Sequence, residues 1–355
     1  MRFIIFTKSN WSEAPRMRHQ LALLLAEKEN KVLFFEKQNY FWERKKRSYD
    51  SGFLNIELRK TRQLIHHKLR VFLLLGSLNA YYEKYQIKKI NYSTDDIIIN
   101  FNYDYYFLRD IFPENHIITI INDDHISSAL LGYEKPIKKV LQKTCISSDD
   151  VLTVSYPLHD SLSLFCKPKI FFPWSDKKYI KPSYNKTRNI FLYWGYINNR
   201  IDWEFIKKII VLCNKEIIDI QFLFVGPLQI SKKIYSEISK SRYTKFLPES
   251  KLDDLPLDQI ICGFIPYKNY PDITQITLPN KSLQLLCRGL PLVITGMPYF
   301  IRRNFVIKFT DYQLNNLVQY LKDNFYVLQK EIATFVDLHN KNNAYNNFIN
   351  LLKNY

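Results

Sequence analysis

Short apolar runs alternate with longer segments of helical periodicity along the chain. In the first half, runs of β-branched and aromatic residues predict strands at 3–7, 31–36, 97–100, 117–122 and 151–155. Between the first two runs, the apolar spacing over 16–28 predicts a helix that completes one βαβ unit. This alternation of strand and helix is typical of a parallel sheet covered by helices.

The second half of the chain repeats this organisation. Apolar runs predict strands at 169–172, 190–194, 220–225, 260–265 and 292–295, and helical periodicity predicts helices at 202–213 and 282–288 and from 313 onward. We therefore predict an α/β protein with two Rossmann-like, doubly wound parallel-sheet domains that face each other across a cleft, followed by a helical tail. The expected parts are residues 1–168, residues 169–329, a crossing at 171–176, and a C-terminal helix at 330–355 that packs back on the first domain.

Charge and cysteine content narrow the function. The chain of 355 residues has 51 Lys+Arg against 34 Asp+Glu, a formal net charge of +17, so its surface attracts polyanions such as nucleic acid, anionic lipid or phosphorylated small molecules. Its five cysteines are scattered without a Cys-x-x-Cys pair, which argues against a structural zinc site or a disulfide scaffold and predicts free thiols in a reducing cytoplasm. The N-terminal apolar run is too short for a signal peptide, and the longest apolar stretch, 71–75, is far below the ~18 residues of a membrane span. A soluble or peripheral cytoplasmic protein is expected.

The most informative segment runs from Leu278 to Val293, with the sequence LPNKSLQLLCRGLPLV. It predicts a polar cap, a short helix closed by Gly289, and a buried strand opened by Pro291. A helix N-terminus after a strand leaves backbone N–H groups free, and with Lys281 beside them it can bind a diphosphate, while Gln284 one turn on can reach ribose hydroxyls. A capped helix with a solvated lysine explains the same residues equally well.

This segment resembles the nucleotide-sugar loop of GT-B glycosyltransferases, whose usual form is Pro-Asn-Lys, two residues, Glu, and then Gly-x-Pro-Val-Val. Four further segments resemble the family in the same order along the chain. Residues 11–25 are similar to the start of bacterial polysaccharide glycosyltransferases, 190–202 to the first strand and loop of the donor domain, and 225–227 and 246–248 to two further donor-domain landmarks. The resemblance implies that the first domain binds the acceptor and that the second binds the nucleotide sugar, without a metal or a resident cofactor.

The resemblance also implies which residues bind the donor. They are Gly195, Arg200, Phe246, Leu247, Asn280, Lys281, Ser282 and Gln284. Lys281 and Arg200 would stabilise the departing diphosphate in place of a metal, and the 246–248 segment would offer backbone contacts to a uracil-like base, so a UDP-sugar is the expected donor. A surface role at the helix that begins near Asp202 explains Arg200 equally well, and core packing does the same for Phe246.

The stereochemical outcome follows from a departure from the family pattern. Many retaining members carry two glutamates eight positions apart, and the corresponding residues here are Ile276 and Gln284. Lys281 followed three residues later by Gln284 is closer to the glucuronosyltransferase-like enzymes of exopolysaccharide synthesis, which invert. We expect inversion, and a retaining transferase is the alternative within the fold.

An inverting transfer needs a general base for the acceptor hydroxyl. Asn122-Asp123-Asp124-His125 follows a predicted strand, so the resemblance implies that Asp123 or Asp124 is the base. Adjacent carboxylates alternate in direction, so only one of them can point into the cleft, and an Asx turn or a helix cap explains the other. His125 and His19 are weaker candidates.

Residues 59–89 suggest where the protein works. Eight Lys and Arg residues interleave there with apolar residues, and Glu83 is the only acid. Such a stretch suits docking on an anionic bilayer that presents a lipid-linked acceptor, although an ordinary helix with a solvated face fits equally well.

Together these features predict a hexosyltransferase of bacterial surface-polysaccharide synthesis (O-antigen, capsule or exopolysaccharide). It would act on a lipid-linked or glycan acceptor at the inner face of the cytoplasmic membrane. Two other classes stay open. One is a basic nucleic-acid-binding protein, which the absence of a recognisable nucleic-acid motif and of an aromatic platform disfavours. The other is a non-catalytic scaffold with the same fold.

Overall fold

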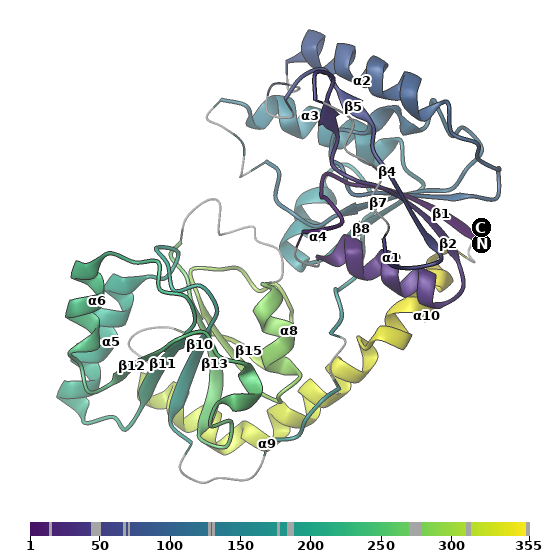
Figure 1. The fold of residues 1–355 in the computed structure, drawn as a ribbon. Helices are drawn as coiled ribbons and strands as arrows, with labels where there is room; N and C mark the ends of the chain where they lie inside the picture. The colour runs from purple at the N-terminus through teal and green to yellow at the C-terminus, as the bar shows by residue number, and fades with distance from the viewer. Residues whose placement is uncertain are drawn as a thin grey trace. The chain divides into compact units, whose positions relative to one another are not determined.

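A computed structural model describes residues 1–13, 16–43, 51–66, 69, 72–126, 129, 132–175, 178–182, 188–269, 279–309 and 314–352, with the backbone alone at Leu73 and Asn280. The chain forms two compact units, Met1–Pro173 and Trp174–Tyr355 (Figure 1). The division falls between Pro173 and Trp174, within the segment predicted as the crossing. Asp176, at the end of that segment, lies outside the described residues.

The first unit is built on a seven-stranded sheet in which all pairings are parallel, in the order β4-β2-β1-β6-β7-β8-β9. Its strands are β1 (Arg2–Phe6), β2 (Lys31–Phe35), β4 (Ile56–Arg59), β6 (Ile97–Asn100), β7 (Ile117–Ile121), β8 (Asp150–Thr153) and β9 (Lys169–Ile170). The strand predicted at 169–172 for the second half thus pairs with β8 in the first unit instead. Two-residue strands β3 (Asn39–Tyr40) and β5 (Arg62–Gln63) form a separate parallel pair.

The order of the strands reverses at β1, because β2 lies on one side of it and β6 on the other. In open parallel sheets, ligands bind at the carboxyl ends of the strands beside such a reversal. Helices α1 (Met17–Glu27), α2 (Leu73–Ile87), α3 (Glu134–Ile146) and α4 (Tyr156–Leu162) and a 3₁₀ turn η2 (Tyr106–Leu108) connect the strands. The topology therefore directs attention to the loops after β1, β6 and β7.

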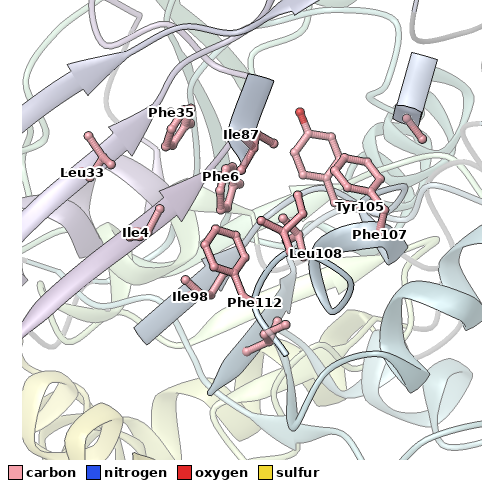
Figure 2. Close-up of a cluster of buried hydrophobic side chains, with 13 residues drawn as sticks. Ile4, Phe6, Leu33, Phe35, Ile87, Ile98, Tyr105, Phe107, Leu108 and Phe112 are labelled. Atoms are coloured by element: carbon pink, nitrogen blue, oxygen red, sulfur yellow. The ribbon is translucent and has the colours of Figure 1, made fainter. Parts of the chain in front are cut away.

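Apolar side chains on one face of this sheet form a continuous core (Figure 2). Phe6 on β1 stacks on Phe35 of the neighbouring strand with ring centroids 4.7 Å apart, and it contacts Phe112 at 6.1 Å. Strands β1, β2 and β7 are buried on both faces, which is why they appear in the sequence as unbroken apolar runs. This core fixes the positions of the loops that carry the candidate site.

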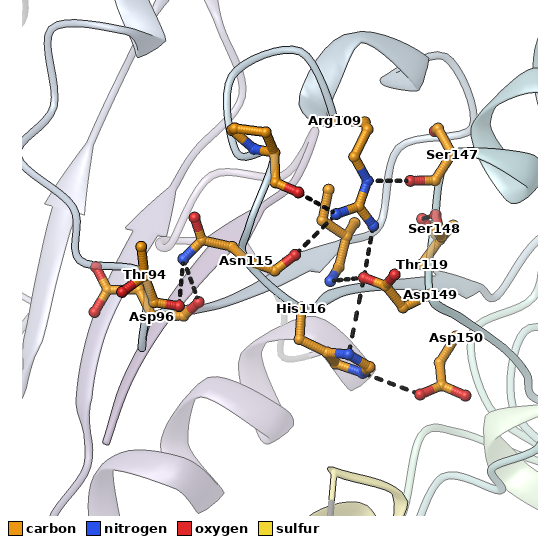
Figure 3. A network of polar contacts seen from close by, with 12 residues as sticks. Thr94, Asp96, Arg109, Asn115, His116, Thr119, Ser147, Ser148, Asp149 and Asp150 are labelled. Carbon is orange, nitrogen blue, oxygen red and sulfur yellow. Dashed lines mark hydrogen bonds and ion pairs between the residues drawn. The ribbon is translucent and has the colours of Figure 1, made fainter. Parts of the chain in front are cut away.

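The amino-terminal edge of the sheet is held by a network of polar side chains (Figure 3). Arg109 donates to Asp149 at 2.6 Å and to the carbonyls of Pro113 and Asn115 at 3.1 Å each. Asp149 also accepts the backbone N–H of Ile117, the first residue of β7, at 2.7 Å. This network ties the starts of β7 and β8 together.

The second unit contains a six-stranded parallel sheet in the order β12-β11-β10-β13-β14-β15. Its strands are β10 (Ile190–Trp194), β11 (Gln221–Val225), β12 (Thr244–Leu247), β13 (Ile260–Pro266), β14 (Leu292–Thr295) and β15 (Val306–Lys308). Its helices are α5 (Trp203–Glu216), α6 (Lys232–Ser239), α8 (Asn280–Leu286), α9 (Leu314–Leu338) and α10 (Lys341–Leu352), with a 3₁₀ turn η3 (Leu252–Asp254). The strand order reverses between β10 and β13.

The predicted helical tail is present as α9 and α10, while Gln313 and residues 353–355 lie outside the described part of the chain. That residues 330–355 pack on the first unit stays a prediction. Within the described ranges, no helix has both the length and the hydropathy that a bilayer crossing requires.

Candidate functional site

Two glycine loops at the carboxyl edge of the second sheet approach each other closely. Gly195 follows β10 and Gly226 follows β11, and both have positive φ, +127° and +140°. A Cβ added to Gly226 would lie 2.2 Å from the carbonyl oxygen of Gly195. Only glycine fits there, so the backbone at the ends of the central strands carries no side chain at these two positions. We call Gly195 and Gly226 together the glycine floor.

Lys281, in the first turn of α8, lies over this floor. Its Nζ is 3.6 Å from the ring centroid of Tyr193 and 5.2 Å from that of Tyr267, and a Cβ on Gly195 would meet Nζ at 3.5 Å. Burial, with a smaller contribution from the charge of Arg200, lowers the pKa of Lys281 to about 7. Within the described residues Lys281 has no ion pair with a carboxylate, so aromatic rings and backbone surround an ammonium group that suits an anionic ligand.

Arg200 adds a second positive charge to this cluster. Its side chain is exposed, and its charge acts on Lys281, Tyr193 and Tyr267. Asp202 caps α5 with its own carboxylate, which accepts the N–H of Phe205 at 3.0 Å, so the helix does not depend on Arg200 for its cap. Burial raises the pKa of Tyr193 and of Tyr267, and the Tyr193 hydroxyl donates to the carbonyl of Tyr196 at 2.7 Å. Two neutral phenols and two cationic side chains therefore share this edge.

The other expected donor residues have mixed surroundings. Ser282 is fully buried and its Oγ has no hydrogen-bond partner among the described residues, while Gln284 is half-buried on the same helix. Asn280 begins α8, but its side chain lies outside the described part of the structure. Phe246 stacks on Phe224 with centroids 5.1 Å apart and contacts Tyr235 at 5.2 Å, which is the packing role weighed above, and Leu247 ends β12.

In the first unit, Asp123 and Asp124 follow β7 and take different roles. Asp124 accepts the backbone N–H of Ile126 at 3.1 Å, the geometry of an Asx turn. The Asp123 side chain is exposed, yet the surrounding protein desolvates its carboxyl and raises its pKa, an effect that Arg18 and Arg16 oppose and Asp124 reinforces. Asp123 is thus the better placed of the two to accept a proton.

The two histidines are placed differently. His19 accepts the backbone N–H of Arg16 at Nδ1 (3.1 Å), and its Nε2 lies 3.0 Å from the carbonyl of Asn10, which assigns a neutral ring with the proton on Nε2. Both of its nitrogens serve the start of α1. His125 lies 4.6 Å from the ring of Tyr103, and burial with the charge of Lys8 lowers its pKa to about 4. Neither is placed as well as Asp123 for taking up a proton.

Sequence reasoning missed Arg18 as a functional candidate. It is only 6% exposed, lies 6.0 Å from the Phe101 ring, and acts electrostatically on Asp123 and His125. The pair Arg16 and Arg18 at the start of a predicted helix was the available signal, and its burial could not be deduced without the fold.

Among the residues described, no group of three or more His, Cys, Asp and Glu side chains is arranged to hold a metal ion. The five cysteines are free thiols in the structure.

No protein-family model matches the sequence, and no curated protein matches it. Solved structures do match. A sucrose-phosphate synthase from Thermosynechococcus elongatus aligns with 99% of this chain and 98% of its own at a TM-score of 0.66 and 13% identity. An α,α-trehalose-phosphate synthase (UDP-forming) from Burkholderia vietnamiensis covers 99% and 97% at a TM-score of 0.62 and 8% identity.

The chain has the GT-B fold. Anabaena HepE, in a complex with UDP, aligns with 100% of this chain and 99% of its own at a TM-score of 0.62 and 10% identity. The predicted GT-B architecture, with two parallel-sheet domains and C-terminal helices, is therefore confirmed.

Proposed function

We propose that this protein is an inverting glycosyltransferase that moves a sugar from a UDP-sugar to a hydroxyl group of a lipid-linked or glycan acceptor in bacterial surface-polysaccharide synthesis. The observation that carries the proposal is Lys281, a half-buried lysine without a carboxylate partner among the described residues, beside Gly195 and Gly226 in a GT-B fold. The similarity to HepE, solved with UDP and with UDP-glucose, and to a UDP-forming synthase supports UDP as the nucleotide.

In this proposal the second unit binds the donor. Lys281 and Arg200 contact the diphosphate, and the backbone after β10 and β11 allows close approach because Gly195 and Gly226 have no side chains. The diphosphate would raise the pKa of Lys281 back toward its ordinary value, because it supplies the negative charge that the free site lacks. We propose that these two cations, and not a divalent ion, stabilise the leaving group, which full activity in the presence of a chelator would support.

The first unit supplies the base. As the acceptor oxygen forms its bond to the anomeric carbon, its proton passes to the Asp123 carboxylate. The bond from that carbon to the diphosphate breaks on the opposite face, and its electron pair leaves with UDP. A raised pKa makes Asp123 a stronger base than an ordinary carboxylate, which favours this proton transfer.

Helix α2 supports the proposed membrane association. Leu74, Leu78, Tyr81 and Tyr85 lie at helical spacing on one face and are 86%, 54%, 74% and 57% exposed. The exposed Lys88 and Lys89 follow, and Lys89 Nζ lies 4.2 Å from the Tyr85 ring centroid. An apolar face beside lysines suits the interface of an anionic bilayer. Residues 67, 68, 70 and 71 of the predicted 59–89 surface lie outside the described part.

Vesicle binding tests this surface. Wild type should sediment with vesicles containing anionic lipid, and Leu78→Glu should reduce the bound fraction several-fold, while Val211→Glu, at an exposed apolar residue of the second unit, should not. Equal binding by all three proteins would contradict docking through α2.

Nucleotide binding tests the function itself. The melting temperature of the protein should rise with UDP more than with GDP, CMP or a polyanion, and Lys281→Ala should abolish that rise. Lys215→Ala, which removes an exposed lysine near the end of α5, is the matched control and should keep it. Equal small shifts with every anion, unchanged by Lys281→Ala, would mean that only the net charge was detected.

A further inference from the structure

Arg18 is a buried cation without a hydrogen-bonded partner among the residues that the structure describes. The side chain is 6% exposed and its Nε is fully buried without a hydrogen bond; across the described ranges, no hydrogen bond or ion pair of its guanidinium is found. Leaving a charged, multiply donating group desolvated is costly unless something binds it. The Phe101 ring, at 6.0 Å, is a weak substitute for an anion.

The nearby acids do not supply that anion. Asp104 is bound to Lys8 at 2.6 Å, and this lysine also lies over the Tyr103 ring at 4.7 Å. Asp123 attracts Arg18 electrostatically but forms no ion pair with it in the described structure. Glu13 also attracts Arg18 electrostatically, but its carboxylate accepts the backbone N–H of Asn10 at 3.0 Å and forms no ion pair with Arg18 among the described residues. Charges of both signs therefore surround Arg18, and no carboxylate is hydrogen-bonded to its guanidinium in the part of the chain that the structure describes.

Buried polar atoms without partners gather at the same edge of the sheet. They are the Asn102 amide nitrogen and oxygen after β6, His125 Nε2 after β7, Thr153 Oγ1 at the end of β8, and Ser155 Oγ just beyond it. The Tyr103 and His125 rings are 4.6 Å apart, so the loops after β6 and β7 are in contact, and Ile121 pairs with Thr153 at the end of β7 and β8. Such atoms offer both donors and acceptors to the hydroxyl groups of a sugar.

We propose that Arg18 binds a phosphate group of the acceptor, and that the acceptor is a phosphate-bearing sugar whose hydroxyls meet the polar atoms after β6, β7 and β8. This inference rests on the proposed function and names its acceptor class. A guanidinium binds phosphate through paired, charge-assisted hydrogen bonds, which distinguish a phosphorylated acceptor from a neutral one. The phosphate can belong to a soluble sugar phosphate or to a lipid diphosphate, because the same group is recognised in both.

Calorimetry with the full chain saturated with UDP tests the proposal, because the donor site is then occupied. The probes are inorganic phosphate, glucose 6-phosphate, glucose and farnesyl diphosphate. Glucose 6-phosphate or farnesyl diphosphate should bind at least tenfold more tightly than glucose, and the tighter of the two identifies the soluble or the lipid source. Arg18→Gln should weaken binding of the phosphate-bearing probes by ~10–100-fold. Arg303→Gln, at an exposed arginine of the second unit, should not change it.

The outcomes separate the two proposals. Normal UDP binding with neither glucose 6-phosphate nor farnesyl diphosphate bound more tightly than glucose, or with probe binding unchanged by Arg18→Gln, overturns the acceptor inference alone. Absence of UDP binding in the wild type overturns the proposed function. If Arg18→Gln does not fold, phenylglyoxal labelling of the wild type decides: phosphate should protect Arg18 from modification, and no protection overturns the inference.

Discussion

The two edges of the first sheet treat polar side chains in opposite ways. At the amino-terminal edge, Arg109 and Asp149 and their neighbours satisfy one another, and Asn115 Nδ2 donates to three carbonyls while only its Oδ1 is left without a partner (Figure 3). At the carboxyl edge, buried atoms of Arg18, Asn102, His125, Thr153 and Ser155 have no hydrogen-bond partner within the described part of the chain.

This difference separates stability from function. A polar network that is complete in the free protein has nothing left to bind, and its groups hold the strands in register. Unsatisfied buried groups lower stability, and they are expected where a ligand completes the network. Substitutions at the two edges should therefore affect different measurements.

The largest effect is expected at Asp123. Asp123→Asn should lower kcat by ~10²–10⁴-fold, because the variant cannot accept the acceptor proton. Its melting temperature should stay the same or rise at pH 7, since desolvation disfavours the charged carboxylate in the folded state. UDP release assays and thermal melts measure the two effects. A large loss of stability with normal kcat would instead assign Asp123 a structural role, like that of the residues at the amino-terminal edge.

The second effect concerns the glycine floor of the second unit. Gly226→Ala should lower the free energy of unfolding by about 2–4 kcal/mol, because its Cβ would overlap the Gly195 carbonyl oxygen. Gly52→Ala, also at a positive φ but with open space around it, should cost only about 1–2 kcal/mol. Denaturant unfolding measures both. Equal losses would mean that φ, and not the close approach of the loops, decides the cost.

The third effect lies at the amino-terminal edge. Asp149→Ala should lower the free energy of unfolding by about 1–3 kcal/mol by leaving Arg109 and the Ile117 N–H without their acceptor, with kcat and KM unchanged. Asp95→Ala, at an exposed residue before β6, is the matched control and should have no effect. A kinetic change in Asp149→Ala would show that this edge is not purely structural.

The smallest effect is a pH dependence from Lys281. Its pKa of about 7 in the folded protein lies below its ordinary value of 10.5, so between these limits the unfolded chain binds more protons and stability of the free protein rises with pH. UDP binding should reverse the shift and take up a fraction of a proton at pH 8. Calorimetry in buffers of different ionisation enthalpy measures this uptake, which Lys281→Met should remove. An unchanged uptake in that variant would assign the proton to another group.

The sequence predicted the regular part of the fold well. Strands β1, β7, β10 and β14 lie where the apolar runs predicted them, because strands buried on both faces are apolar throughout. The short strands β3, β4 and β5 were not predicted, since Ile56–Arg59 alternates over only four residues and the other two have two residues each. The strand predicted at 169–172 was assigned to the wrong sheet, because its assignment depends on pairing with β8, and no local sequence pattern reveals that partner.

The candidate site also contains residues that the sequence could predict and residues that only the fold could reveal. Lys281 was found because it belongs to a local motif, whereas the choice of Asp123 over Asp124 needed the turn at Ile126. Arg18 was missed because a basic residue in a first helical turn is normally solvated. It is 6% exposed, and the aromatic ring that its guanidinium faces, Phe101, lies more than 80 positions away in the sequence.

The exclusively parallel pairing of both main sheets also determines how the chain must fold. No two adjacent strands of either sheet can be closed by a tight turn, so each ladder forms only after a long crossover segment has closed. Such non-local pairing makes folding slow and leaves strand edges exposed in intermediates for longer. The edge strands β9 and β15 have only two and three residues, and a short edge strand is a poor template for pairing with another chain. Their shortness therefore protects the protein from edge-to-edge aggregation.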